Sequence, residues 1–420
     1  MSTTYTRFTL HEDWTVGVLG FLIILLAAIG ITAPVPSFGW GSSSDLFQTV
    51  LSVSNLQAIA IQFILVLIIA GIGAMLTGKP LLHLVVSFVA VYVLTLIALT
   101  LAGNKQVKDL NLEAVIFSLA LGLLIGNVFK LPGWFRKSLS TELFVKIGLV
   151  LLGTSIIFSD ILKAGSQGLL QALVVVISVW YFAFWLCRKL KVDDELTMMI
   201  SSAVSICGVS AAIATAGAIK GDTKKLSYVI SMVLITAIPM MIFMPYIAQY
   251  FHFPQEVTGA WLGGSIDTTG AVVASGTLVG ERALEISTIV KFSQNVLLGV
   301  AAFGISIYWT YTKNPLAQQA DTKPTLAIIW ERFPKFVLGF IGASLLFSFL
   351  ITPEISTAVK PSLKSLQGLW FALAFTSIGL ETRFSDLFNK NSRKPLYAFL
   401  IAQLFNIFIT LILAFLIFGS

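Results

Sequence analysis

The stretch SICGVSAAIATAG, Ser205–Gly217, places small and weakly polar residues in a chain otherwise rich in Leu, Ile, Val and Phe. Gly and Ser weaken a helix and leave backbone N–H groups without partners. In hydrocarbon every such group must be satisfied inside the protein or in a water-filled cavity. We therefore expect an interrupted segment here. A second stretch, GGSIDTTGAVVASG at Gly263–Gly276, has the same character.

Composition indicates a membrane protein. Of the 420 residues, 57% are hydrophobic and 11% are charged, whereas a soluble domain carries about 25% charged residues. Apolar runs of roughly 20 residues are long enough to cross the bilayer as helices. We expect an all-α polytopic membrane protein, with residues 1–420 forming a single transmembrane transporter domain. The eleven expected spans lie near 14–33, 56–77, 81–102, 112–129, 142–157, 169–187, 226–250, 283–312, 335–352, 364–381 and 395–418.

Basic residues predict the topology. The clusters that mark cytoplasmic loops include Lys130 with Arg136 and Lys137, Arg188 with Lys189 and Lys191, and Lys220 with Lys224 and Lys225. The last two clusters flank segment 197–219, so this segment satisfies the positive-inside rule only if it re-enters the cytoplasm. Segment 257–279 has almost no basic residues on either side, which favours both ends outside. The alternative is that one or both segments are broken helices that cross.

This topology places the amino terminus in the cytoplasm and the carboxyl terminus outside, in a multi-pass protein of the bacterial cytoplasmic membrane. The charge pattern does not fit everywhere. The lysines that fall outside are Lys105, Lys108, Lys163 and Lys360. An uncleaved first helix is favoured over a cleavable signal peptide, which remains the alternative.

Internal similarity predicts inverted repeats. GTSIIFSD at 153–160 resembles GLETRFSD at 379–386, and hydrophobic positions correspond between 112–187 and 338–413. In the expected topology the paired spans run in opposite directions, as in many secondary transporters. The repeat-like elements cover 112–250 and 257–418. Chance similarity between apolar segments is the alternative.

The two interrupted segments supply the candidate binding site. A helix that restarts at Gly208 or Gly270 directs free N–H groups and the positive end of its dipole into the membrane, which suits an anion. Nearby hydroxyl groups add donors. The candidate substrate-binding residues are Ser205, Cys207, Gly208, Val209, Ser210, Gly264, Ser265, Thr268, Thr269 and Gly270. The alternative is that these small residues only allow close helix packing.

Charged and amide groups at membrane depth are the candidates for ion coupling. Asp267 suits a proton carrier or a cation ligand, because an intramembrane carboxylate normally faces a cavity or a partner. A helix-capping role is its alternative. Lys146 and Lys291 are the other deep charges, although either side chain could extend to an interface. Gln294 and Asn295 add polar groups to the same helix as Lys291.

The segments SICGVSAAIA, GGSIDTTGAVVASG, GLVLLGTSIIFSDILKAG and SIGLETRFSDL followed by RKPL resemble the YeiH-type family, which is regarded as a family of sulfate exporters. The likeness covers most of 110–418. It implies a membrane transporter with inverted repeats, distantly similar to the bile-acid and cation–proton antiporter folds. Members commonly carry a His-Glu-Val-Ala-Gln-like run where this chain has Asp267–Ala271. This departure leaves the coupling ion and the substrate open.

Other function classes lack their motifs. These 420 residues contain no Walker motif, no HExxH, no Cys/His metal spacing and no catalytic Ser/His/Asp set, so we expect neither an enzyme nor an ATP-driven pump. We expect no cofactor and no metal, although H⁺ or Na⁺ is the candidate coupling ion. Lys and Arg are scattered over loops, which argues against nucleic acid. Cys187 and Cys207 form no disulfide framework.

The sequence therefore predicts a secondary-active transporter of a small anion. The favoured substrate is sulfate or a related sulfur oxyanion, and the favoured mode is export coupled to protons. One alternative is a cation–proton or sodium-coupled antiporter or symporter with Asp267 as the cation ligand. An anion channel is the second alternative. The expected partners are the anion and the lipid bilayer, and a homodimer is left open.

Overall fold

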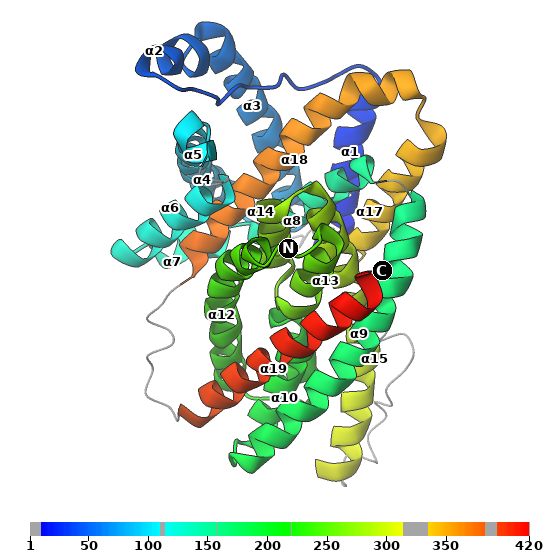
Figure 1. Ribbon diagram of the computed structural model, residues 1–420. Coiled ribbons are helices and arrows are strands. Elements are labelled where there is room, and N and C mark those ends of the chain that lie inside the picture. Colours follow the sequence, from blue (N-terminus) through cyan, green and yellow to red (C-terminus); the bar gives the residue numbers. More distant parts are fainter. Residues whose placement is uncertain are drawn as a thin grey trace, which may run out of the picture. The chain divides into compact units, whose positions relative to one another are not determined.

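The computed structural model describes residues 10–109, 114–156, 158–219, 221–313, 335–382 and 393–419, and these residues are largely helical (Figure 1). Within these ranges the only β-type pairing is an isolated bridge between Trp40 and Asn104. The all-α fold class is confirmed.

The chain divides into two compact units. Unit 1 comprises Met1–Ser159 and Lys335–Arg383, and unit 2 comprises Asp160–Pro334 and Phe384–Ser420. Two of the boundaries fall inside the octapeptides GTSIIFSD and GLETRFSD, so the chain changes unit within two residues of corresponding points of the internal similarity. The single transmembrane domain and the repeat-like elements 112–250 and 257–418 stay predictions.

The described residues of unit 1 form seven longer helices, joined by short helical turns. They are α1 (Glu12–Ala28), α3 (Val53–Leu76), α4 (Leu81–Ala102), α6 (Ala114–Val128), α8 (Thr141–Leu152), α17 (Phe336–Leu345) and α18 (Pro353–Glu381). The short elements are α2 (Ser43–Asp45), η1 (Leu46–Val50), α5 (Lys105–Asp109), α7 (Gly133–Ser138), η2 (Gly153–Ser155) and η4 (Leu346–Leu350).

Glycines set the closest helix contact in unit 1. A Cβ on Gly126 would lie 2.9 Å from the Leu380 carbonyl oxygen, and one on Gly379 would lie 2.6 Å from the Leu119 carbonyl oxygen. Since no side chain intervenes, α6 and α18 pack backbone against backbone.

Unit 2 contains most of α9 (Phe158–Lys189), both interrupted segments and three further long helices. Its other elements are α10 (Asp194–Ser205), α11 (Val209–Ile219), α12 (Thr223–Tyr250), α13 (Gln255–Ser265), α14 (Thr269–Val279), α15 (Glu281–Lys313) and α19 (Arg393–Phe418). The sequence expectation of two interruptions is confirmed, because neither segment forms one continuous helix.

The first interrupted segment, α10–α11, folds back as a re-entrant hairpin. Its two ends meet beside the start of α12. The backbone N–H of Asp222 donates to Glu195 at 3.0 Å, and the Lys225 ammonium pairs with Asp193 at 2.7 Å. Both ends of the segment therefore lie together at the end of unit 2 where α12 begins, which agrees with the return that the charge pattern predicts.

The second segment, α13–α14, is also a hairpin, with its ends at the other end of α12. The Gln249 side chain donates to the Leu278 carbonyl at 3.0 Å, and the Ala283 N–H donates to the side chain of Gln255 at 3.3 Å. The 28 residues of α12 extend about 42 Å at 1.5 Å per residue. The hairpins thus enter unit 2 from opposite ends, which is the arrangement that the re-entrant prediction requires.

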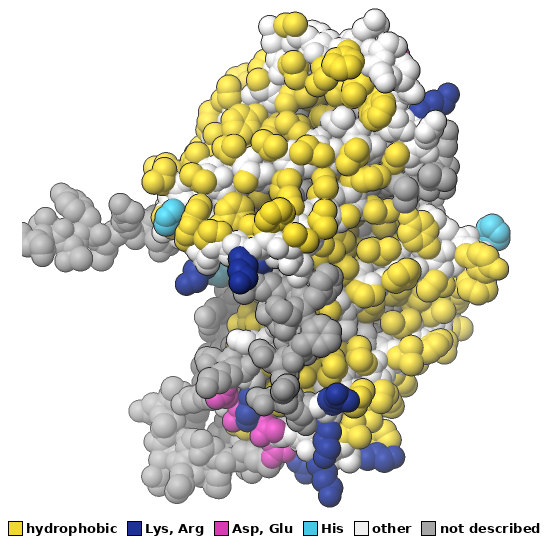
Figure 2. All heavy atoms as spheres, turned by 90° about the vertical axis from the view of Figure 1, so that its left-hand side faces the viewer, with side chains coloured by type: hydrophobic (Ala, Val, Ile, Leu, Met, Phe, Trp, Pro, Cys, Tyr) yellow, Lys and Arg dark blue, Asp and Glu magenta, His cyan; other side chains and the backbone are white. Residues whose placement is uncertain are grey.

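Each of the eleven predicted spans overlaps a helix, and the match for 335–352 is α17 with η4. Seven helices in the described residues are long and apolar enough to span a bilayer. They are Val53–Leu76, Leu81–Ala102, Gly133–Ser155, Ile161–Lys189, Lys225–Tyr250, Glu281–Trp309 and Arg393–Phe418. Hydrophobic side chains cover most of the described surface in Figure 2. The protein is a multi-pass membrane protein.

Candidate functional site

The tips of the two hairpins touch inside unit 2. Ile206–Gly208 joins α10 to α11, and Ile266–Thr268 joins α13 to α14. Gly208 has φ +57°, a conformation that glycine adopts readily. A Cβ at this position would lie 2.6 Å from Val233 and 2.9 Å from the Cβ of Asp267. Both the turn and the contact with Asp267 therefore require glycine.

Helix α15 supports both tips with a polar pair three residues apart. The ammonium of Lys291 donates to the Ile206 carbonyl and to the Gln294 side-chain oxygen, each at 2.9 Å. The Gln294 amide donates to the carbonyls of Ser205 at 2.9 Å and Gly264 at 3.3 Å. A helix carboxyl end carries partial negative charge, so the buried cation stabilises the end of α10.

Helix α19 contributes a second pair with the same spacing. The Gln403 amide donates to the Ser265 carbonyl at 2.8 Å. The Asn406 amide donates to the carbonyls of Val204 at 3.0 Å and Ser265 at 3.3 Å. Residues three apart share one helix face, so each pair can reach two chain segments at once. Gln294 and Asn406 each hold the carboxyl ends of both α10 and α13.

Asp267 lies in the break between α13 and α14 and is only 2% exposed. Its carboxylate interacts with the positive charge of Lys291 and with the side-chain amide of Gln403. Its Oδ2 atom has no hydrogen-bond partner among the described residues. Thr268, rather than Asp267, caps α14 through the N–H of Ala271 at 3.3 Å. The carboxylate is therefore available to a ligand or a proton.

Several predicted donors are already engaged within their own hairpins. The Ser205 hydroxyl donates to the Ser201 carbonyl at 2.7 Å, and the Ser265 hydroxyl donates to the Trp261 carbonyl at 2.6 Å. The Gly208 N–H donates to the Ala203 carbonyl at 3.0 Å. These three groups therefore stabilise the interrupted helices, and their hydrogen atoms are already donated to carbonyls of the same hairpin.

The open backbone donors lie one step further along each hairpin. Within the described part of the chain, the N–H groups of Val209 and Ser210 on α11, and of Thr269 and Gly270 on α14, have no acceptor. Such groups are the normal unpaired donors of a helix amino end. Ser210 is exposed, and Thr268 and Thr269 are half-buried. The unpaired N–H groups at the starts of α11 and α14 therefore lie on the same short segments as the accessible hydroxyl groups of Ser210, Thr268 and Thr269.

The remaining candidates occupy different surroundings. Cys207 is buried in the tip of the first hairpin. A Cβ on Gly264 would meet the Gln171 amide nitrogen at 2.5 Å. The amide nitrogen of Asn295 lies 3.4 Å from the Thr269 hydroxyl, and its Oδ1 atom is unpartnered in the described residues. Asn295 thus joins the second tip.

Lys146 belongs to unit 1, whereas Asp267 and Lys291 belong to unit 2. Its ammonium pairs with Asp13 at 2.9 Å, Glu142 at 3.5 Å and Glu12 at 3.6 Å. Asp13 also accepts the backbone N–H of Lys335 at 3.0 Å. This network ties α1, α8 and the start of α17 together. A coupling role for Lys146 stays a prediction.

The sequence analysis missed Gln171, Gln403 and Asn406 and gave Gln294 no role. A signal was present, because the spacing of Gln403 and Asn406 in α19 repeats that of Lys291 and Gln294 in α15. Each amide alone resembles an isolated polar residue in an apolar span. The repeated spacing becomes informative once both helices are known to face the hairpin tips.

Comparison with known proteins places this arrangement in a family. The family described as conserved hypothetical protein 698 matches residues 81–398. A UPF0324 membrane protein of Rhodopirellula baltica is 39% identical over 367 residues, which cover 85% of this chain and 67% of the relative. One from Nitratidesulfovibrio vulgaris is 36% identical over 364 residues, 83% of this chain and 62% of the relative. The chain thus spans about two thirds of the length of these relatives.

The relatives' names describe membrane proteins and state no substrate. No solved structure matches the chain. The match to the family extends from α4 into α19 and includes both hairpins. The chain therefore belongs to the family of conserved hypothetical protein 698, as its resemblance to the YeiH-type proteins predicts.

Proposed function

We propose that the protein is a secondary-active transporter that carries a small anion, sulfate or a related sulfur oxyanion. The observation that carries the proposal is the meeting of two re-entrant hairpin tips around the buried Lys291 and Asp267. Irregular backbone at membrane depth is tolerated where it is buried or lines a cavity. Transporters with inverted repeats commonly bind substrate at such broken helices.

The donors favour an anion. The first turns of α11 and α14 offer unpaired N–H groups, and Ser210, Thr268 and Thr269 add hydroxyls that are not fully buried. Helix amino ends bind oxyanions through these groups and through the helix dipole. The resemblance to a family of sulfate exporters supports a sulfur oxyanion.

Proton coupling follows from the position of Asp267. An ionised carboxylate repels an approaching anion, whereas a protonated one does not. Proton and anion binding at adjacent positions therefore favour each other, which is a coupling free energy between two sites. Lys291 is the cation that faces this carboxylate, and Cys207 is the other titratable group beside Lys291.

The proposed orientation follows the basic loops. The cluster around Arg188 and Lys225 lies at the cytoplasmic end of α12, so the second hairpin enters from outside. The amino terminus is then cytoplasmic and the carboxyl terminus is outside. The protein lies in the bacterial cytoplasmic membrane and exports the anion.

A sodium-coupled carrier is the second candidate. It is favoured by two unpartnered oxygens at the second tip, Oδ2 of Asp267 and Oδ1 of Asn295, in the described residues. Carboxylate and amide oxygens are the ligands that hard cations prefer.

Radiolabelled sulfate exchange in proteoliposomes tests the proposal. We expect saturable uptake into sulfate-loaded vesicles and stimulation by a pH gradient. The control is Lys146→Met, which changes a deep lysine of unit 1. Lys291→Met should abolish exchange, whereas Lys146→Met should retain it. Absence of exchange with the folded wild-type protein would refute the anion proposal. Stimulation by a sodium gradient alone would favour the second candidate, and unitary conductance would favour a channel.

A further inference from the structure

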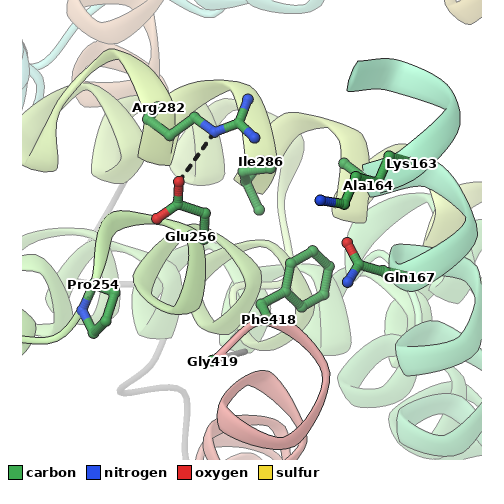
Figure 3. Close-up of a pocket in the computed structure, with 9 residues that line it drawn as sticks. All are labelled: Lys163, Ala164, Gln167, Pro254, Glu256, Arg282, Ile286, Phe418 and Gly419. Atoms are coloured by element: carbon green, nitrogen blue, oxygen red, sulfur yellow. Dashed lines mark hydrogen bonds and ion pairs between the residues drawn. The ribbon is translucent and has the colours of Figure 1, made fainter. Parts of the chain in front are cut away.

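A polar stripe runs along one face of α9. Lys163, Gln167 and Gln171 follow one another at four-residue intervals, so their side chains lie on one face of the helix. Lys163 and Gln167 line a cavity of about 300 Å³ at the end of unit 2 where α13 and α15 begin (Figure 3). The stripe therefore leads from this cavity toward the interior of the unit.

Four helices form the mouth of the cavity. Besides α9, they are α13, α15 and α19. The residues that these helices and their flanking positions place around the cavity are Pro254, Glu256, Arg282, Ile286, Phe418 and Gly419. Arg282 pairs with Glu256 at 3.3 Å, as drawn in Figure 3, and with Glu285 at 3.2 Å. The Gln167 amide donates to the Ile417 carbonyl at 2.9 Å, so its side chain is fixed at the wall. The mouth is thus polar and built from ordered side chains.

Gln171 lies one helical turn beyond the cavity and is 0% exposed. Its amide nitrogen donates to the Ala260 carbonyl at 2.8 Å, and its Oε1 atom takes no part in this hydrogen bond. Within the described ranges this oxygen has no hydrogen-bond partner. Gln171 also abuts Gly264, the residue before Ser265 at the end of α13.

Gln403 continues the series. Its amide nitrogen holds the Ser265 carbonyl, while its Oε1 is unpartnered in the part of the chain that the structure describes. The Gln403 side chain also interacts with the carboxylate of Asp267. After the Oε1 atoms of Gln171 and Gln403, the Oδ2 atom of Asp267 is the third unpartnered oxygen of the series in the described residues. Buried polar atoms of this kind require an explanation such as ordered water or an ion. Three unpartnered acceptors thus belong to residues that are linked, through Gly264 and Ser265, from the edge of the cavity to Asp267.

We propose that this series is a water-mediated proton route from the cavity to Asp267. The unpaired atoms are all acceptors, which suits the O–H groups of water. The amides orient the waters and exchange no protons themselves. A hydronium ion at the mouth gives one proton to the first water, each water binds a proton on its oxygen and releases another to the next, and the last water protonates the Asp267 carboxylate. Every O–H bond that forms is thus matched by one that breaks.

The route admits protons and excludes the anion. Gln171 is fully buried and does not line the cavity, so the cavity, the space that could admit sulfate, ends before Gln171. The charged groups that face the route are Lys291 beside Asp267, and Lys163, Glu256, Arg282 and Glu285 at the mouth. The inference rests on the proposed proton coupling, but access to the route is measurable without transport.

Cysteine accessibility in the purified full-length protein tests the route. In a Cys187→Ala/Cys207→Ala background, Gln171→Cys should react with a small methanethiosulfonate reagent about tenfold faster than Val175→Cys, because thiol reactivity requires access. Val175 is the matched control, since it lies one turn deeper on the same face, is 0% exposed and packs in an apolar cluster. Equal rates would overturn the proposal.

A plug at the mouth provides the second arm. Gln167→Trp should slow the labelling of Gln171→Cys, whereas Leu170→Trp, on the exposed side of α9, should not. An unchanged rate with Gln167→Trp would contradict the route. In proteoliposomes, Gln171→Leu should reduce pH-gradient-driven sulfate flux and retain sulfate–sulfate exchange. If the wild type performs no exchange, the transport proposal fails, while the labelling result still decides the route.

Discussion

At the scale of single residues, Gly208 is a position with little freedom to change. Its φ of +57° and its contacts with Val233 and Asp267 both exclude a side chain. Gly208→Ala should reduce stability by about 1–3 kcal/mol from backbone strain alone. The matched control is Gly304→Ala in α15, where nothing lies within 4 Å of the added Cβ. Thermal unfolding in detergent should show a lower Tm for the first variant alone.

Asp267 is the residue that we predict to decide the coupling ion. In the wild type, protonation removes a charge that repels the anion, so sulfate binding should strengthen as pH falls. Asp267→Asn lacks that ionisable group and should show sulfate binding that no longer depends on pH. It should also keep anion exchange and lose the response to a pH gradient. Binding and flux measured across pH check this. A lost sodium dependence instead would identify a cation ligand, and unchanged behaviour would contradict a coupling role.

Residue chemistry was the part of the site that the sequence predicted least well. The small residues correctly indicated where the chain breaks, because Gly and Ser are unfavourable in a helix. They did not show that the N–H of Gly208 and the hydroxyl of Ser205 already have acceptors in their own hairpin. Lys146 looked like a deep charge near a site, yet Glu12 and Asp13 of α1 hold it. Such partners are distant in sequence and depend on packing.

At the scale of elements, α15 and α19 hold the two hairpins together through matching amides. Gln294 and Asn406 each bind carbonyls from both hairpins. Asn406→Leu should destabilise the protein by about 1–3 kcal/mol, because the Val204 carbonyl loses its side-chain donor and the Ser265 carbonyl keeps only Gln403 in the described residues. Phe408→Leu on the exposed side of α19 serves as the control and should change little. Equal Tm values for the two variants would show that the amide does not hold the tips.

The hairpins themselves were predictable because two independent signals agreed. Small residues indicated an interruption, and basic loops on both sides of 197–219 indicated a return to the same face. The contacts between Glu195 and Asp222 close that hairpin as expected. The polar pairs on α15 and α19 were harder to predict. A single amide in an apolar span does not reveal which distant carbonyl it binds.

At the scale of the whole molecule, the helices that overlap the eleven predicted spans followed from hydrophobic runs, whereas the division into two units did not. Both units consist of similar apolar helices, so composition cannot separate them. The unit boundaries near Ser159 and Arg383 fall in the repeated octapeptides, where the chain leaves one unit for the other. The internal similarity therefore marks two of the three points at which the chain passes between units.

The opposite entry of the hairpins makes a prediction for the protein in its membrane. Lys189→Cys and Lys224→Cys, in a background without Cys187 and Cys207, should react with an impermeant thiol reagent from the same face. Phe251→Cys should react from the other face, because α12 extends about 42 Å, more than the roughly 30 Å hydrocarbon core. Labelling in right-side-out and inverted vesicles distinguishes the faces. The positive-inside rule places the two lysine positions in the cytoplasm. Labelling of these two positions from opposite faces would exclude the re-entrant first hairpin, and labelling of all three from one face would exclude a spanning α12.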